Sequence, residues 1–408
     1  MTRPAAVVAT LAAVLLLGAC SDGAGRTPSE SEPAGPARSS AAPEPPGVRI
    51  GEPVWATRTS GLEVPQLLGA GDDVLLVGDV RGGGESSLQV LDADSGRRLW
   101  RLRDDDGDGS STYYAEPGVE VGRAGSGRYL VTVPYEQYTC PATGDPDDCV
   151  VEAGIEARDA RSGEVPWRWR ASGTDSSDGF VTGAVVTEQA VLVPRRGGTL
   201  GLDPTTGERA WWADVQPPGA VEGDVGVSGP AAGGDGPYRV LDLASGDTVR
   251  SIDPDEAPAG PVGDVLALPD GDAVRLEDAR SGRVLGSVDG GEVPPLALRA
   301  DGGLAWRVAG DRLVSLVPGE AEPVVTRLPE EVASADTALA HFAGGVDGGV
   351  WFVLVDGVVR TVGRDGAVDD DPGPEAVTVR SVSGRTLVLQ VGTELVGPEP
   401  AVAVRRIH

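Results

Sequence analysis

The sequence predicts an all-β fold built from one strand–turn–strand unit that recurs along the chain. Two observations carry this prediction. Short runs that alternate apolar and polar residues, which are typical of half-buried strands, precede a phrase of the form Asp-x-x-Ser/Thr-Gly-x-x-x-Trp. The phrase then recurs at a spacing of roughly 40 residues, a period expected of a propeller or solenoid rather than a single sandwich.

Three copies of the phrase are complete, and each of their fixed residues has a structural role. The aspartate can accept hydrogen bonds from backbone N–H groups in the turn, and the glycine supplies the positive φ of a tight hairpin. The tryptophan falls in the following strand, where its ring can pack between neighbouring sheets. The fixed residues are Asp92, Gly96 and Trp100, then Asp159, Gly163 and Trp167, then Asp203, Gly207 and Trp211. Two further copies, Asp242–Gly246 and Asp278–Gly282, keep the turn but lack the tryptophan.

The phrase resembles the tryptophan-docking repeat of propellers of the pyrroloquinoline-quinone type, approximately Ala-x-Asp-x-x-x-Gly-x-x-x-Trp. The segment Ala157–Trp167 matches every fixed position, and the copies ending at Trp100 and Trp211 match except for the alanine. The later copies match only in the turn. The resemblance implies a β-propeller but no particular activity, because many propellers of this group bind no quinone.

The number of expected outer strands favours an eight-bladed propeller, with seven blades as the alternative. These strands are expected near Trp55, Trp100, Trp167, Trp211, Arg250, Gly286, Val325 and Val368. The strand around Trp55 has no turn before it, and the final segment, residues 376–408, offers only three strands. We therefore expect the N-terminal strand to pair with the C-terminal strand and close the last blade, which removes an open edge.

The N-terminal residues indicate export and attachment to a membrane. Arg3, an apolar run and small residues predict a signal peptide over residues 1–19. Its ending, Leu-Gly-Ala-Cys, resembles a bacterial lipobox, which implies that Cys20 becomes the lipid-modified N-terminus; an ordinary signal peptide with a chance cysteine is the alternative. Residues 20–49 predict a disordered tether, so the propeller should span residues 50–408. We expect a protein outside the cytoplasm that meets the membrane through its lipid alone.

The composition limits the chemistry that the chain can perform. A net charge of −29 argues against a nucleic-acid partner and indicates either a solvated acidic surface or a cationic partner. Only two histidines, His341 and His408, are present, which disfavours a Ser-His-Asp triad or a histidine metal site. The chain also lacks Asn and an adjacent Cys-Cys pair, which the quinone-dependent dehydrogenases of the resembled family use. We expect no quinone and no catalysis.

Candidate site residues gather in the long interval between Trp100 and Trp167. Asp104, Asp106 and Asp108 form an Asp-x-Asp-x-Asp-Gly pattern that suits Ca²⁺ and resembles the start of an EF-hand loop. The pattern departs from that loop because Glu116 comes one residue too late. A solvated acidic turn is the alternative to a Ca²⁺ site.

Two further groups of residues belong to the same interval. Cys140 and Cys149 are expected to form a structural disulfide in a long loop over residues 135–154, which an exported compartment permits. Four tyrosines predict either a recognition patch or packing beneath this loop. They are Tyr113, Tyr114, Tyr135 and Tyr138. In a propeller the acidic loop and the cysteine loop emerge on the same face, so we expect them to be neighbours.

These expectations favour a membrane-anchored lipoprotein whose propeller binds an unknown protein or cell-envelope ligand without catalysis. The analogy is with propeller lipoproteins that assist outer-membrane protein assembly, and it concerns the fold alone. Two alternatives stay open. One is a divergent quinoprotein-type or carboxylate-based enzyme that uses the central channel, and the other is a sensor of an extracellular ligand.

Overall fold

The computed structural model describes residues 50–407 with gaps, the longest of which are 141–149, 172–180, 328–340, 364–377 and 391–399. Cys20, the predicted signal peptide and the predicted tether lie outside the described residues. The described part consists of 33 strands without a helix, which confirms the all-β prediction. It accordingly contains no helix that could span a membrane.

The strands form antiparallel sheets, most of which contain four strands in chain order. The first has β2 (Glu63–Ala70), β3 (Val74–Arg81), β4 (Ser86–Asp92) and β5 (Arg98–Arg103). The next such sheets have β12 (Val185–Val186), β13 (Val191–Arg195), β14 (Gly198–Leu202) and β15 (Arg209–Ala213), then β16 (Ala220–Glu222), β17 (Val225–Ser228), β18 (Tyr238–Asp242) and β19 (Thr248–Ile252).

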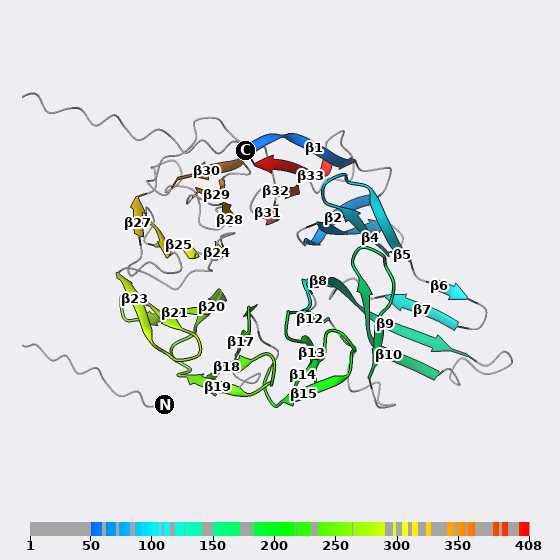
Figure 1. Cartoon of the computed structure of the whole chain (residues 1–408), viewed down its shortest axis with the longest axis horizontal. Helices are drawn as coiled ribbons and strands as arrows, with labels where there is room; N and C mark the ends of the chain where they lie inside the picture. The colour runs from blue at the N-terminus through cyan, green and yellow to red at the C-terminus, as the bar shows by residue number, and fades with distance from the viewer. Residues whose placement is uncertain are drawn as a thin grey trace, which may run out of the picture. The chain divides into compact units, whose positions relative to one another are not determined.

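The same order continues toward the C-terminus. Two more sheets have β20 (Ala259–Val262), β21 (Val265–Asp270), β22 (Ala273–Asp278) and β23 (Val284–Asp289), then β24 (Ala297–Leu298), β25 (Leu304–Val308), β26 (Arg312–Leu316) and β27 (Val324–Arg327). A three-stranded sheet follows with β28 (His341–Val346), β29 (Val350–Val355) and β30 (Val358–Val362). Up-and-down sheets repeated in this way make the fold a β-propeller (Figure 1).

The last sheet takes one strand from the other end of the described chain. Its own strands are β31 (Thr378–Val382), β32 (Thr386–Gln390) and β33 (Pro400–Ile407). Strand β1 (Ile50–Arg58) pairs antiparallel with β33, with Ile50 opposite Ile407 and Trp55 opposite Val404. The expected strand near Val368 lies outside the described residues.

Buried apolar side chains fill the interfaces between consecutive sheets. Leu76 and Val90 of the first sheet, for example, cluster with Val131 and Val133 of the second. Further clusters join the second sheet to β12–β15, this sheet to β16–β19, and this one to β20–β23. Runs of consecutive apolar residues supply both faces of a sheet, because Val74 and Leu76 belong to one cluster, whereas Leu75 and Val77 belong to another.

The repeated turn has the hydrogen bonds that the sequence predicts. The Asp159 carboxylate accepts hydrogen bonds from the backbone N–H groups of Arg161 at 3.1 Å and Ser162 at 2.8 Å. Gly163 has a φ of 73°, and its N–H donates to the Asp159 carbonyl at 2.8 Å. Equivalent bonds to the turn aspartate occur in the other four copies, at Asp92, Asp203, Asp242 and Asp278.

The tryptophan of each complete repeat docks on the turn of the next repeat. The indole N–H groups of Trp100, Trp167 and Trp211 donate to backbone carbonyls at 2.8, 3.0 and 3.0 Å, respectively. Their acceptors belong to Ala160, Pro204 and Leu243. A Cβ added to the turn glycines Gly163, Gly207 and Gly246 would come within 2.8, 2.5 and 2.5 Å of the rings. The turn therefore requires glycine both for its positive φ and for the space that the indole occupies.

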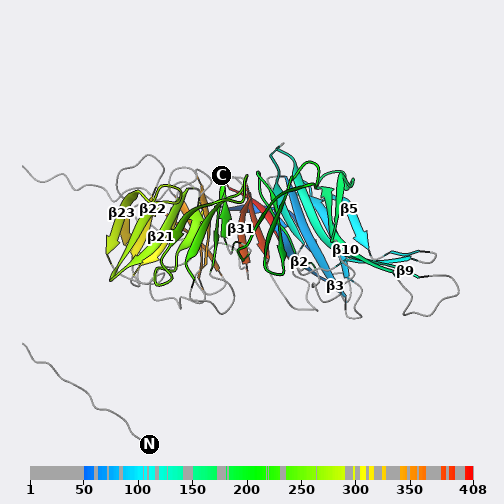
Figure 2. The ribbon, with the colours of Figure 1, turned by 90° about the horizontal axis from the view of Figure 1, so that it is seen from below.

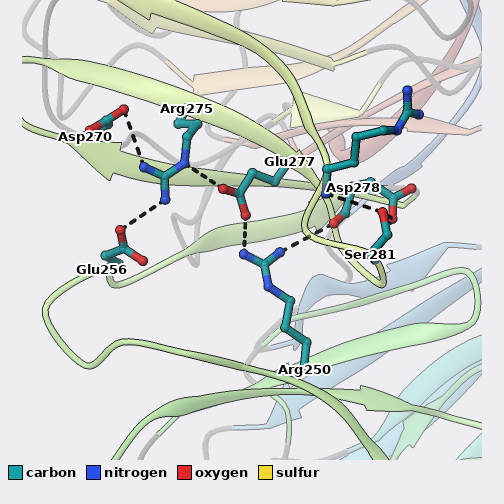
Figure 3. Close-up of polar contacts among 8 residues, drawn as sticks. Arg250, Glu256, Asp270, Arg275, Glu277, Asp278 and Ser281 are labelled. Atoms are coloured by element: carbon teal, nitrogen blue, oxygen red, sulfur yellow. Dashed lines mark hydrogen bonds and ion pairs between the residues drawn. The ribbon is translucent and has the colours of Figure 1, made fainter.

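In the fourth repeat, Arg250 occupies the tryptophan position, eight residues after Asp242. Its Nη1 donates to the Asp278 carbonyl at 3.4 Å, and a Cβ on Gly282 would meet its Cζ at 3.1 Å. The guanidinium thus lies on the next turn as the indoles do. Its charge is paired with Glu277, which is 4% exposed (Figure 3).

The Glu277 carboxylate also pairs with Arg275, at 2.6 Å from Nε to Oε1. Arg275 in turn contacts Glu256 at 3.0 Å and Asp270 at 3.4 Å. Glu277 immediately precedes the turn aspartate, a position that holds Leu202 and Leu241 in the two preceding repeats. An acidic residue at this position therefore accompanies the basic residue at the tryptophan position.

We predict that Arg250 and Glu277 form an exchangeable pair. Glu277→Leu should lower the free energy of unfolding by about 3–5 kcal/mol, because Arg250 loses its buried counter-ion. Adding Arg250→Trp should recover most of that loss, since an indole can donate to the Ala279 carbonyl, the equivalent of the acceptors of the other three tryptophans. Urea unfolding of both variants and of Arg250→Trp alone tests this prediction. A double variant no more stable than Glu277→Leu would contradict it.

The turn aspartates predict a loss of stability in acid. Hydrogen bonds from Ser95 and Ser281 lower the pKa of Asp92 and Asp278. A carboxyl with a lowered folded-state pKa stabilises the fold above its unfolded pKa, about 3.9, and this contribution disappears as the pH falls through the folded value. Ser281→Ala should therefore melt below wild type at neutral pH, by a difference that shrinks below about pH 4. Circular-dichroism melts across pH provide the measurement, and a constant difference would contradict the prediction.

Candidate binding surface on the second sheet

The second sheet carries an extension that the other described sheets lack. Strands β9 (Tyr129–Thr139) and β10 (Val150–Asp159) pair from Leu130 opposite Asp159 to Thr139 opposite Val150. Strand β8 (Glu120–Arg123) pairs with the first part of β9, and β7 (Ser110–Tyr114) with the last part. Strand β6 (Asp105–Gly107) pairs with β7.

We define the outer extension as β6, β7, residues 135–139 of β9 and residues 150–153 of β10. In Figures 1 and 2, these strands reach beyond the other sheets of the propeller. The interval 135–154 was expected to be a loop, but residues 135–139 and 150–154 are strand, so that expectation was wrong for them, and residues 141–149 lie outside the described residues. Its β-prone valine and tyrosine residues pair across β9 and β10 instead. Ser110, which follows the acidic segment, lies opposite Thr139, which precedes Cys140.

Pro134 marks the joint between the sheet and its extension. The pairs between β8 and β9 end at Thr132, and those between β7 and β9 begin at Tyr135. In the described part of the chain, Val133 and Pro134 therefore have no strand partner on that side. Because proline has no N–H to contribute to a ladder, this change of partner is a favourable place for it.

Polar side chains fix the base of the outer extension. Tyr135 is only 3% exposed, and its hydroxyl donates to Glu152 Oε1 at 3.0 Å. Arg170, in β11 (Trp167–Arg170), pairs with the same oxygen at 3.0 Å. The Arg168 guanidinium lies 5.7 Å from the Tyr135 ring centroid. Burial and then the Glu152 carboxylate raise the pKa of Tyr135 far above its usual value, so the phenol stays a protonated donor.

A buried carboxylate continues this base toward the first sheet. Glu156 is 1% exposed and pairs with both Arg158 and Arg168. The Arg158 guanidinium lies 5.9 Å from the Trp100 ring of β5. Sequence reasoning missed Glu152 and Glu156 because acidic residues are abundant in this chain. Their positions two and six residues after Val150, on one face of β10, are the signal that could have found them.

The four tyrosines do not form one surface. Tyr135 is a packing residue, so the recognition interpretation is wrong for it. Tyr138 is half-buried, and its hydroxyl donates to Glu136 Oε2 at 2.8 Å. Tyr113 and Tyr114 lie in β7, opposite Glu136 and Tyr135, and their side chains lie outside the described part.

The edge of β10 exposes the largest apolar surface of the outer extension that the structure describes. Val150 is 68% exposed and Val151 is 53% exposed. Strand β11 pairs with β10 only from Gly154 to Ala157, and no described strand pairs with residues 150–152 on that side. Backbone groups along such an edge are available to another strand.

Three predicted sites fall wholly or partly outside the described residues. Asp104 and Asp108 of the candidate Ca²⁺ pattern lie there, while Asp106 belongs to β6, opposite Ser111, and not to a turn. Among the described residues, no group of three potential ligands is arranged to hold a metal. Cys140 follows β9, but Cys149 is not described, so the disulfide stays a prediction, as does lipidation of Cys20.

No protein-family model and no curated protein match the chain. Among solved structures, BamB from Moraxella catarrhalis is 16% identical, with a TM-score of 0.47 over 84% of this chain and 96% of BamB. Apo AztD from Citrobacter koseri is 15% identical, with a TM-score of 0.41 over 74% of this chain and 85% of AztD. A europium-containing methanol dehydrogenase is 12% identical, with a TM-score of 0.41 over 84% of each chain. Likeness at this level carries no argument about function.

We predict that the acidic segment binds no Ca²⁺. Placing Asp106 in a paired strand removes it from the turn that an Asp-x-Asp-x-Asp-Gly loop would need. The melting temperature should therefore be the same in Ca²⁺ and in chelator, for wild type and for Asp106→Ala. A rise with Ca²⁺ that disappears in Asp106→Ala would contradict the prediction.

Proposed function

We propose that the protein is a non-catalytic scaffold that binds a cationic protein partner through the outer extension. In this proposal, lipid on Cys20 and the tether of residues 20–49 hold an eight-bladed propeller outside the cytoplasm, and the pairing of β1 with β33 closes its last blade. The observation that carries the proposal is the pair of exposed valines on an extension with a fixed base.

The charge of the outer extension indicates the kind of partner. The outer extension contains four acidic residues, Asp105, Asp106, Glu136 and Glu152, and neither lysine nor arginine. Its strands are close in the fold because β7 pairs with both β6 and β9. An acidic surface attracts a cationic partner and steers its approach.

The arrangement also suits binding because the base is already ordered. Glu152 is held by Tyr135 and Arg170, and Glu156 by Arg158 and Arg168. A surface that is fixed before binding loses less conformational entropy when a partner docks. Exposed apolar residues surrounded by polar ones are typical of an interaction surface.

The two buried carboxylates that the structure describes favour a structural role over catalysis. Glu156 pairs with Arg158 and Arg168, and Glu277 pairs with Arg250 and Arg275. Each carboxylate therefore pairs with two guanidinium groups, which is the arrangement of a buried ion-pair network. A general acid or base would instead face a site that admits substrate.

Photo-crosslinking in the native cell tests the proposal. A photoreactive residue at Val150 or Tyr138 should capture a discrete protein partner, whereas the same residue at Val284 should not. Val284 is a matched control because it is a valine, 55% exposed, on strand β23 of another sheet. Adding Asp105→Asn and Asp106→Asn should reduce capture at Val150. Equal capture at Val150 and Val284, or capture at neither Val150 nor Tyr138, would contradict the proposal.

A further inference from the structure

The outer extension has two free edges in the described part of the chain, and their side chains differ. The edge formed by β6 carries Asp105 and Asp106. Charged residues on an edge strand are a common protection against pairing with another chain. The edge of β10 carries Val150 and Val151, which are 68% and 53% exposed. The edge of β10 therefore lacks the protection that β6 has.

The backbone of β10 already has the extended geometry that pairing with another strand requires. Strand β10 keeps an unbroken register with β9 up to the pair of Val150 and Thr139. On its other side, the N–H of Ala171 donates to the Ala153 carbonyl at 2.9 Å, and the described ladder stops there. A strand placed along residues 150–152 would continue the line of β11 at the spacing of a β-sheet.

The side chains on this edge specify the composition of an added strand. Val150 and Glu152 share one face of β10, whereas Val151 lies on the opposite face, with Tyr138. Cross-strand neighbours of the valines favour apolar residues, and the neighbour of Glu152 favours a basic one. A short extended segment that mixes valine-like and basic residues fits these positions.

The negative charge of the outer extension favours a partner protein as the source of that strand. It disfavours both a second copy of this chain and another segment of the same chain. A second copy would bring the same four acidic residues of the outer extension against this surface. Segment 172–180, which follows Ala171, carries Asp175 and Asp178 and no basic residue. Both would add like charges to an acidic surface, which is unfavourable.

We infer that the cationic partner binds by adding an extended basic strand to β10 along residues 150–152. This inference rests on the proposed function and specifies the binding mode. Backbone hydrogen bonds to the β10 edge supply affinity, and the alternating side chains supply specificity.

Synthetic peptides that repeat Arg-Val-Val test the binding mode, with the full-length protein titrated by calorimetry. In an antiparallel added strand, this order places a basic residue opposite Glu152 and apolar residues opposite Val151 and Val150. An eight-residue peptide should bind wild type, and N-methylation of all its backbone amides should weaken binding by at least about tenfold, because the ladder bonds are lost while the charge is kept. Val151→Arg should weaken binding of the unmethylated peptide to a similar extent. Val284→Arg, on β23, should leave binding unchanged.

Each contrary result separates the binding mode from the proposed function. Equal binding of the two peptides would overturn strand addition and leave the acidic binding surface intact. Absence of binding at roughly 1 mM peptide would also overturn strand addition. Crosslinking at Val150 would then decide whether the scaffold function survives. Self-association in sedimentation that disappears in Val151→Arg would assign the edge to a second copy and overturn the inference.

Discussion

An indole laid on the turn glycine of the next repeat sets the relation between consecutive sheets. The contact satisfies the buried indole N–H with a backbone carbonyl and fills the space left by a residue without a side chain. Because both partners belong to the same repeated phrase, the second sheet and the sheet β12–β15 each receive a ring from the sheet before and give one to the sheet after. Arg250 shows which properties the contact needs: a planar group with N–H donors suffices, provided that Glu277 neutralises its charge.

The outer extension depends on these contacts. Trp100 donates to the carbonyl of Ala160, immediately after β10. Trp167, the first residue of β11, donates to the carbonyl of Pro204 in the turn of the next sheet. The second sheet is therefore held on both sides, and β9 and β10 project from a fixed base. A mobile hairpin of the same composition would lose more conformational entropy on binding.

The fold could be read from the sequence because the Asp, Gly and Trp of the turn recur with fixed spacing, and these residues form the contacts between sheets. The outer extension could not be recognised in the same way, because it occurs once and its strands have no repeat to mark them. Tyr135 and Tyr138 differ by three positions, which places them on opposite faces once the segment is known to be a strand. Val150 and Val151 are residue types that usually lie in a core. Their exposure becomes clear only in the structure, where the pairing of β11 with β10 stops at Gly154.

The pairing of β1 with β33 imposes an order on folding. Ile50 and Ile407 are neighbours in the sheet but stand at opposite ends of the described chain. Of the described strands, β1 is synthesised first, and it stays without its partner until β33, the last of them, has been made. The contact has a very large sequence separation, so its loop-closure entropy favours late formation and slow folding. Until then β1 has unpaired backbone groups. The newly synthesised chain is therefore the form most prone to aggregation and to binding by chaperones.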